Sequence, residues 1–442
     1  MQKTFRIGGI HPPANKWSAG KPIVKADIPA QAIVPLAQHI GAPAQPVVKK
    51  GDKLKAGALI AKAGGFVSAN IHAPVSGSVL KIDEALDASG YKRPAIFIDT
   101  EGDEWDEGID LSPEIRRDCS LAPQEIIAAI NRAGIAGMGG ATFPTHVKLT
   151  PPPGHTAEIV IINAVECEPF LTSDHALMLA HGEEMLIGTS LLMRALGVGK
   201  AAIGIESNKP DAIALLTRMA AAFEGISVVP LKVRYPQGGE KQLIDAIVRR
   251  QVKSGALPIS AGAVVQNAGT AFAVYEAVQK NKPLVERIVT VTGRGVSAPA
   301  NYLARIGTPL RQLMEASGLT ANPGKIISGG PMMGKAVASA DIPVTKGCSG
   351  ILVLSPDESR RKPMRNCIRC AKCVDACPMG LNPTLLMNAA EFAAWDTAET
   401  NYAADCIECG SCNYVCPSNR PLLDHIRIAK GKVMEIARSR KS

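Results

Sequence analysis

The chain of 442 residues has no run of 18 or more apolar residues, and aromatic residues make up only 4% of it. A membrane-spanning helix needs about 20 consecutive apolar residues. The first residues, MQKTFRIGGIHPP, also lack the apolar core of a secretory signal. We therefore expect a protein that is neither secreted nor membrane-spanning by its own sequence, and the abundance of 41 Gly and 32 Pro indicates turn-rich globular domains.

The net charge of +9 is moderate, and its most concentrated part is the stretch from Lys430 to Lys441. Base-reading or aromatic motifs beside that charge are missing, which argues against a nucleic-acid partner. An anionic membrane surface or an acidic protein would suit the charge. The simplest interpretation is a solvated basic tail.

Eight of the 11 cysteines form two copies of C-x2-C-x2-C-x3-C, each followed by proline. This spacing is typical of two-cluster bacterial ferredoxins, in which each copy lends its fourth cysteine to the other copy's cluster. It exceeds what a tetrahedral zinc ion or a redox dithiol needs. The sequence predicts two [4Fe-4S] clusters, one on Cys367, Cys370, Cys373 and Cys416 and the other on Cys406, Cys409, Cys412 and Cys377.

The first hundred residues set short apolar strands between Gly and Pro turns, as in VVKKGDKLKAGALI and IHAPVSGSV. This pattern resembles the barrel-sandwich fold of biotinyl and lipoyl carrier domains. Their cofactor is attached to a lysine on an exposed hairpin, but residues 64–70 here contain no lysine. We expect a docking or structural role for this unit.

From about Pro123 the pattern changes to alternating strands and helices, such as a strand at 158–165, a helix at 175–196 and a strand at 200–205. The predicted fold class is multidomain α/β and α+β. The expected units are a barrel-sandwich β unit (1–110), an α/β domain (118–262), a small β-type ligand-binding unit (263–350), a helical two-cluster ferredoxin domain (355–425) and a basic helical tail (426–442).

Residues 134–148, GIAGMGGATFPTHVK, form a second signal. Gly137, Gly139 and Gly140 allow backbone N–H groups to approach a ligand and to form an anion-binding nest. Lys148 is a candidate counter-charge for a phosphate, and Phe143 could stack on a flat ring. The loop is not the G-x-G-x-x-G fingerprint of dinucleotide-binding domains.

This loop resembles the flavin-binding loop G-R-G-G-A-G-F-P-T-G-x-K of the FMN-bearing, NADH-oxidising subunit of respiratory complex I. Three later segments, NAVECEP (163–169), YPQGGE (235–240) and QNAGT (266–270), resemble that family's segments in the same order. With the barrel-sandwich unit in front and the cluster motifs behind, the whole chain resembles the RnfC/RsxC family of the Rnf/Rsx electron-transport complexes. FRIGGIHPP (5–13) and SGGPMMG (328–334) strengthen the resemblance.

The resemblance implies non-covalent FMN, NADH as substrate, and a role for each matching residue. Gly137, Gly139 and Gly140 would face the flavin, with Lys148 on its phosphate or ribityl side and Asn163 hydrogen-bonded to it. Glu166 and Glu168 would line the nicotinamide or ribose pocket, and Phe143 would stack near the adenine. The flavin side would be completed by Glu240, Asn267 and Thr270.

The resemblance also implies a peripheral subunit on the cytoplasmic side of the cell inner membrane. It would pass electrons from NADH through its own clusters to other subunits of a complex, or in the reverse direction. That complex would exchange electrons with ferredoxin-type carriers and couple the electron flow to ion translocation. Met138 and Val165 depart from the complex I pattern. They keep open the alternative of an electron-wiring subunit that binds no nucleotide. A second alternative is a soluble flavin and iron–sulfur reductase similar to the corrin reductases, which share the flavin and cluster modules, although the N-terminal place of the barrel-sandwich unit argues against it.

Overall fold

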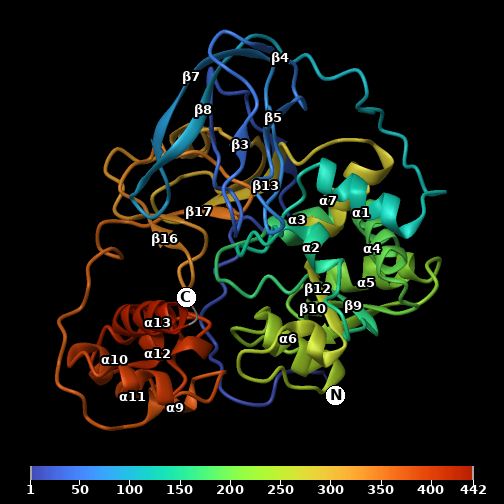
Figure 1. The fold of residues 1–442 in the computed structure, drawn as a ribbon. Helices are drawn as coiled ribbons and strands as arrows, with labels where there is room; N and C mark the ends of the chain where they lie inside the picture. Colours follow the sequence, from blue (N-terminus) through green and yellow to red (C-terminus); the bar gives the residue numbers. More distant parts are fainter. Residues whose placement is uncertain (1, 441–442) are drawn as a thin grey trace.

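A computed structural model describes residues 2–440 of the chain. Its two β-rich units are stacked at the top of Figure 1, the α/β domain lies to the right, and a helical unit lies at the lower left. The four kinds of unit are those expected from the sequence, but the expected boundaries at residues 263 and 426 are wrong.

The α/β domain is built on a four-stranded parallel sheet with helices on both faces. Because both faces are buried, its strands are nearly continuous apolar runs. The strands, in spatial order, are β11 (Ile226–Leu231), β10 (Ala201–Glu206), β9 (Ile159–Asn163) and β12 (Ala263–Asn267). One face packs against α1 (Pro123–Arg132), α3 (Ser173–Ala180), α4 (Gly182–Leu196), α5 (Pro210–Ala220) and α7 (Ala268–Gln279). The other face packs against α6 (Glu240–Val248).

The positions of β12 and α7 show that the expected domain boundary at residue 263 is wrong. Residues 263–279, which we expected to open the small β unit, pair with β9 and cover the parallel sheet instead. The α/β domain therefore includes them. As a result, Asn267 lies beside Asn163 at the same edge of one sheet.

Gly188 marks the place where α4 and α7 cross most closely. A Cβ at this position would lie 1.8 Å from the carbonyl oxygen of Ala271, so the two helices would have to separate. We expect Gly188→Ala to destabilise the domain by about 2 kcal/mol or more, seen as a lower thermal midpoint in circular dichroism. The control is Gly431→Ala on α13, where a Cβ would meet no described atom within 4 Å outside the neighbouring helix backbone and helix propensity favours alanine by about 1 kcal/mol. Equal midpoints for the two variants would contradict this helix contact.

The barrel-sandwich unit consists of two small sheets closed on an apolar core. The larger sheet contains β2 (Gln31–Pro35), β8 (Lys92–Thr100), β7 (Gly77–Leu86) and β4 (Lys53–Leu54). The smaller sheet contains β3 (Gln45–Pro46), β5 (Leu59–Lys62) and β6 (Ile71–His72).

The chain segments before β2 contact the other units of the molecule. The strand β1 (Ile23–Lys25) pairs in parallel with β14 of the six-stranded sheet. Further upstream, Lys3 and Ile10 form isolated bridges with Leu231 and Tyr235 of the α/β domain. The N-terminal segment therefore ties the other units together.

The six-stranded sheet forms the small β unit beneath the barrel sandwich (Figure 1). Its helix α8 (Leu310–Ala316) packs on the sheet through Leu310, Leu313 and Met314. The strands, in spatial order, are β1, β14 (Ala300–Arg305), β13 (Glu286–Thr292), β17 (Gly350–Val353), β15 (Ile326–Ser328) and β16 (Lys335–Ala336).

The helical unit holds both cysteine motifs and ends in the long helix α13 (Leu422–Ser439). Its other helices are α9 (Lys372–Asp375), α10 (Pro383–Glu391), α11 (Trp395–Thr400) and α12 (Ser411–Val415). The expected separate tail from residue 426 is wrong. Ile426, Ala429 and Val433 are buried in the core of this unit, so α13 is part of it. Residues 441–442 lie outside the described residues.

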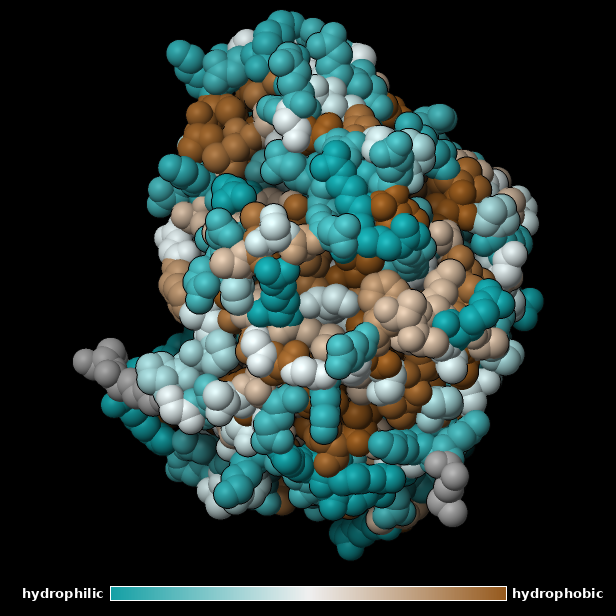
Figure 2. Space-filling view, turned by 90° about the vertical axis from the view of Figure 1, so that its right-hand side faces the viewer, coloured by the Kyte–Doolittle hydropathy of each residue, from teal (hydrophilic) through white to brown (hydrophobic). Residues whose placement is uncertain are grey.

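Within residues 2–440, no helix combines the length and apolar character that crossing a bilayer requires. On the face shown in Figure 2, hydrophobic residues lie in separate patches between hydrophilic ones.

Candidate cofactor sites

The glycine-rich loop connects α1 to the short helix α2 (Thr145–Lys148) and is held from two sides. The Gly137 N–H donates to the Phe143 carbonyl over 2.8 Å, and the Met138 N–H donates to the Thr270 hydroxyl on α7 over 2.9 Å. The Thr142 carbonyl accepts from the Ile40 N–H of the barrel-sandwich unit over 3.2 Å. The loop tip, Gly139 and Gly140, is therefore fixed in place without side chains of its own.

A cavity of about 830 Å³ opens over this loop. It is large enough for a nucleotide cofactor, and it lies at the carboxyl ends of β9 and β12, the edge where parallel sheets bind ligands. Ten of the predicted site residues line it: Gly137, Gly139, Gly140, Phe143, Lys148, Asn163, Glu166, Glu168, Glu240 and Asn267. Thr270 does not line it. Thr270 is fully buried beneath the loop, where its hydroxyl holds the loop by accepting a hydrogen bond from the Met138 N–H.

The cavity wall extends beyond the α/β domain to both β-rich units. Gln38, His39 and Ile40 line it from the barrel sandwich, and residues 328–330 line it from the six-stranded sheet. The amide nitrogens of Gln38 and Gln266 are buried without a hydrogen-bond partner among residues 2–440. Buried polar groups usually have partners, so these two wall residues fit a site whose hydrogen bonds are completed by a ligand.

Lys148 and Glu240 face each other across the cavity floor. The Lys148 Nζ lies 2.7 Å from the Glu240 Oε1 and also donates to the Val265 carbonyl over 3.1 Å. The Glu240 carboxylate stands at the first residue of α6, where the helix dipole favours negative charge. A bound phosphate would share Lys148 with this carboxylate.

Glu166 and Glu168, the two glutamates predicted from the sequence, line the cavity, but their carboxylates accept hydrogen bonds from backbone N–H groups nearby. The Glu166 carboxylate caps α3 by accepting from the N–H groups of Asp174 (2.8 Å) and His175 (3.2 Å). The Glu168 carboxylate accepts from the N–H groups of Met332 (3.2 Å) and Met333 (2.7 Å). Burial raises the pKa of Glu168 to about 7. Glu168 thus fastens the loop 328–334 of the six-stranded sheet to the cavity wall.

Asp174 is a cavity residue that the sequence analysis missed. Its Oδ2 accepts from the Asn267 Nδ2 over 2.7 Å. Burial, and then the nearby Glu166 charge, raise its pKa to about 7. In the sequence it resembles any acidic residue in the first turn of a helix, so nothing marked it as a site residue.

Asp174 should make folding stability depend on pH. Its folded pKa of about 7 lies above the ordinary value of 3.8, so the folded chain binds the extra proton between these values. The stability that this site contributes is therefore present below the ordinary pKa and is lost as the pH rises through about 7. We expect Asp174→Asn to reduce the fall in thermal midpoint between pH 5 and pH 7.5. Asp396→Asn, at an exposed carboxylate on α11, is the control, and matching pH profiles for both variants and the unmodified chain would contradict the assignment.

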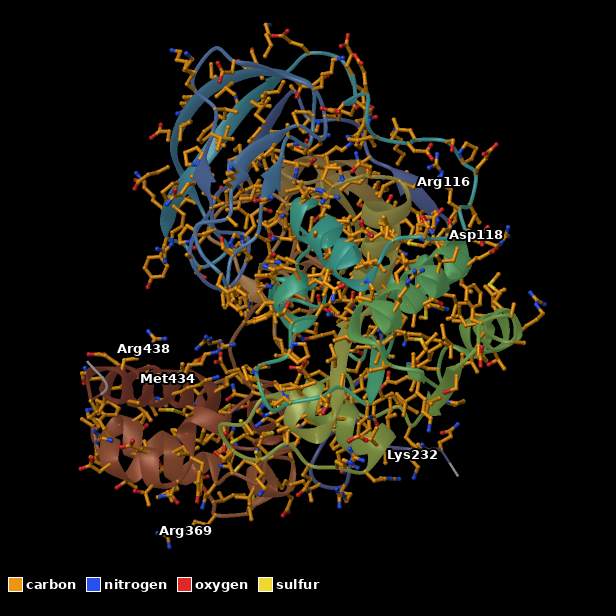
Figure 3. The ribbon with its side chains drawn as sticks, turned by 45° about the vertical axis from the view of Figure 1, so that its right-hand side comes forward. Arg116, Asp118, Lys232, Arg369, Met434 and Arg438 are labelled. Carbon is orange, nitrogen blue, oxygen red and sulfur yellow. The ribbon has the colours of Figure 1, made fainter. Side chains whose placement is uncertain are left out.

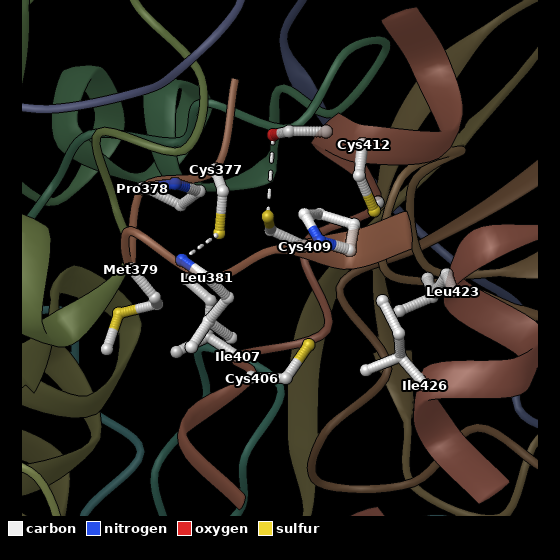
Figure 4. Close-up of a pocket in the computed structure, with 13 residues that line it drawn as sticks. Cys377, Pro378, Met379, Leu381, Cys406, Ile407, Cys409, Cys412, Leu423 and Ile426 are labelled. Atoms are coloured by element: carbon white, nitrogen blue, oxygen red, sulfur yellow. Dashed lines mark hydrogen bonds between the residues drawn. The ribbon is translucent and has the colours of Figure 1, made fainter. Parts of the chain in front are cut away.

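The cysteines Cys377, Cys406, Cys409 and Cys412 line one small pocket in the helical unit (Figure 4). These are the four that the crossed pattern assigns to one cluster, and we call them the inner quartet. Burial raises the pKa of Cys406 to about 11 and that of Cys412 to about 12. Thiolates at this place need a bound cation to stabilise them, which fits an iron–sulfur cluster.

The other four cysteines, Cys367, Cys370, Cys373 and Cys416, form the outer quartet. Their backbone repeats that of the inner quartet: the N–H groups of Arg369 and Glu408 each lie 3.4 Å from the sulfur of the cysteine two residues earlier. Both donors have φ near +57°, at +56° and +58°. The sequence repeat is therefore also a structural repeat, although Cys367 and Cys370 are exposed while Cys409 and Cys412 are buried.

An apolar contact joins the inner quartet to the nucleotide cavity. Ile407, which lies between Cys406 and Cys409 in the sequence, lines both the pocket of the inner quartet and the nucleotide cavity. It packs in one cluster with Cys167, Tyr235 and Cys409, and the Tyr235 hydroxyl donates to the Cys409 carbonyl over 2.8 Å. The inner quartet is thus the one next to the cavity.

Comparison with known sequence families assigns a match to each of the four units. "RnfC Barrel sandwich hybrid domain" matches residues 3–103, and "Nuo51 FMN-binding domain" matches 130–276. "SLBB domain" matches 288–336, and "4Fe-4S dicluster domain" matches 366–421. A flavin-type nucleotide fold joined to a two-cluster ferredoxin fold places the chain among multi-cofactor electron-transfer proteins.

Curated relatives narrow this class to one family. The C subunit of the proton-translocating ferredoxin:NAD(+) oxidoreductase complex of Clostridium ljungdahlii is 46% identical, over 91% of this chain and 88% of that protein. Its Na(+)-translocating counterpart of Acetobacterium woodii is 43% identical, over 99% and 98%. The corresponding component of the ion-translocating oxidoreductase complex of Rhodobacter capsulatus is 42% identical, over 98% and 84%. The chain belongs to this RnfC family, as its sequence motifs predicted.

Among solved structures, an NAD+-reducing [NiFe]-hydrogenase matches 72% of this chain and 66% of its own, at a TM-score of 0.49 and 20% identity.

Proposed function

We propose that this chain passes electrons in either direction between NADH and the other subunits of an ion-translocating ferredoxin:NAD+ oxidoreductase complex. FMN would occupy the cavity over the glycine-rich loop, and the two cysteine quartets would each hold a [4Fe-4S] cluster. The flavin supplies the exchange between the two-electron hydride chemistry of NADH and the one-electron chemistry of the clusters.

The residues around the cavity would hold and shield the cofactor. Gly137, Gly139 and Gly140 carry no side chain, so the flavin can approach the backbone of the loop. Lys148 would neutralise the phosphate with Glu240 beside it. Asn163 and Asn267 would fix the ring from the sheet edge, with Thr270 holding the loop below. Phe143 would stack near the adenine, and Glu166 and Glu168 would border the nicotinamide or ribose while anchoring their loops.

The contact through Ile407 is the observation that carries this proposal. Electron transfer weakens steeply with distance, so a nucleotide site and a cluster that work together must lie close. One side chain borders both spaces here. The inner quartet would therefore exchange electrons with the flavin and the outer quartet with the partner.

The same proposal places the chain as a peripheral subunit on the cytoplasmic side of the inner membrane. Its partners would be the membrane subunits of the complex and, through them, ferredoxin-type carriers. The fact that the chain belongs to the RnfC family supports this placement.

The test is an anaerobic titration of the purified chain with NADH, followed by absorbance. Bleaching of the flavin bands, then of the cluster absorbance, is expected. A chain without flavin or without a response to NADH would instead be an electron-wiring subunit. Washing of cell membranes at low salt is the second measurement. A chain whose flavin responds to NADH, but which this washing removes completely from the membranes, would be a soluble reductase.

A further inference from the structure

The segment 361–372 leads into the outer quartet and is exposed over its whole length. It carries two of that quartet's cysteines, Cys367 and Cys370, which are themselves exposed. The inner quartet is covered by the cavity wall and α13. Of the two quartets, only the outer one therefore has cysteines at the open surface within the described part of the chain.

This segment is strongly basic. It contains five cationic side chains and no carboxylate. Arg361 pairs with Asp424 over 3.4 Å, whereas four cations have no carboxylate within ion-pair distance among residues 2–440: Lys362, Arg365, Arg369 and Lys372. Figure 3 shows Arg369 at the outer edge of the helical unit, pointing away from the rest of the molecule.

Two apolar side chains lie among these charges. Ile368, between the two exposed cysteines, is 67% exposed, and Met364 is 58% exposed. Apolar residues surrounded by a charged rim are typical of protein interfaces. Unpaired charges at a rim steer a partner of opposite charge and speed its association.

We propose that residues 361–372 form the docking surface for an acidic protein domain that carries its own redox centre, on the membrane subunits of the complex. This inference rests on the proposed function and names the partner's chemistry. One electron passes between the outer cluster and the partner's centre, one being oxidised as the other is reduced, with no bond made and no proton moved. A lipid headgroup would match the charge but could not take the electron, so the exposed cysteines favour a protein.

The experiment compares two double variants of the full, cofactor-loaded chain. Lys362→Glu with Arg365→Glu reverses two unpaired cations of the segment. Arg218→Glu with Lys232→Glu makes the same charge change at two exposed cations of the α/β domain that also lack ion pairs within the described residues. Lys232 lies on the opposite side of the view in Figure 3 from Arg369. Each protein is added to membranes from cells that lack only this chain, and rebinding and NADH-driven electron transfer are measured at 50 and 300 mM salt.

We expect the segment variant to rebind at least about tenfold more weakly at low salt. The difference should shrink at high salt because surface charges are screened. The control should stay within about twofold of the unmodified chain, and NADH should bleach the flavin equally in all three proteins.

Rebinding of the segment variant as tightly as the control would overturn the proposal. Binding of the unmodified chain to protein-free phosphatidylglycerol vesicles as tightly as to membranes, lost in the segment variant, would overturn it in favour of a lipid. Failure of NADH to bleach the flavin of the unmodified chain would instead contradict the proposed function, and the rebinding comparison would still report on the surface.

Discussion

Replacing Cys409 with serine is expected to stop electrons from leaving the chain while NADH still bleaches the flavin. Cys409 belongs to the inner quartet, which borders the nucleotide cavity through Ile407. Loss of one thiolate removes or cripples a [4Fe-4S] cluster. Electron delivery to the membrane partner should fall by at least about a hundredfold. Electron paramagnetic resonance after addition of NADH should then show neither cluster reduced, because the remaining outer cluster has lost its supply.

The order of the two quartets makes a second variant informative. Cys373→Ser in the outer quartet should also stop delivery, but NADH should still reduce the inner cluster. Cys119→Ser, at a cysteine outside both motifs, is the control and should keep both signals. If Cys409→Ser and Cys373→Ser gave the same spectrum, or if both lost flavin bleaching, the proposed order of carriers would be wrong.

Gly140→Val should empty the nucleotide cavity without touching the clusters. Gly140 has φ +99°, a backbone conformation that a β-branched residue adopts only with strain. Apart from Gly140 and its two chain neighbours, no atom of residues 2–440 lies within 4 Å of where its Cβ would stand. The added side chain would therefore occupy space at the loop tip that we assign to the flavin. We expect the flavin content of the purified protein to fall by at least about tenfold, because the valine side chain takes the flavin's place and the backbone strain, about 1–3 kcal/mol, falls on the loop that would hold it.

Gly51→Val is the control that separates the effect of backbone strain from the effect of a side chain placed at the loop tip. Gly51 has φ +90° and equally open surroundings, but it lies in a turn of the barrel-sandwich unit. This variant should keep its flavin, and iron content should be unchanged in both. Full flavin occupancy in Gly140→Val would show that the cofactor lies elsewhere.

The cysteine motifs could be interpreted from the sequence because ligand spacing is a local property. Two copies at equal spacing predict two similar backbone paths, and the left-handed residues Arg369 and Glu408 repeat at matching positions. The strand predicted at 200–205 is β10, and the strand predicted at 158–165 contains β9, because buried parallel strands are continuous apolar runs.

Features that depend on distant parts of the chain could not be predicted in this way. The helix expected at 175–196 is two helices that meet at His181. The unit boundary at residue 263 was wrong because an apolar strand does not reveal which sheet it joins. The boundary at residue 426 was wrong because the apolar face of α13, at Ile426 and Val433, does not reveal which unit it packs against. Only the folded chain brings Asp174 to Asn267, and Gln38 to the cavity wall.

The most direct test is quantitation of iron, acid-labile sulfide and flavin in the chain isolated under strict exclusion of oxygen. Two cubane clusters and one flavin predict about eight iron, about eight sulfide and about one FMN per chain. Zinc in place of iron, or a preparation with neither metal nor flavin, would contradict the assignment of both sites.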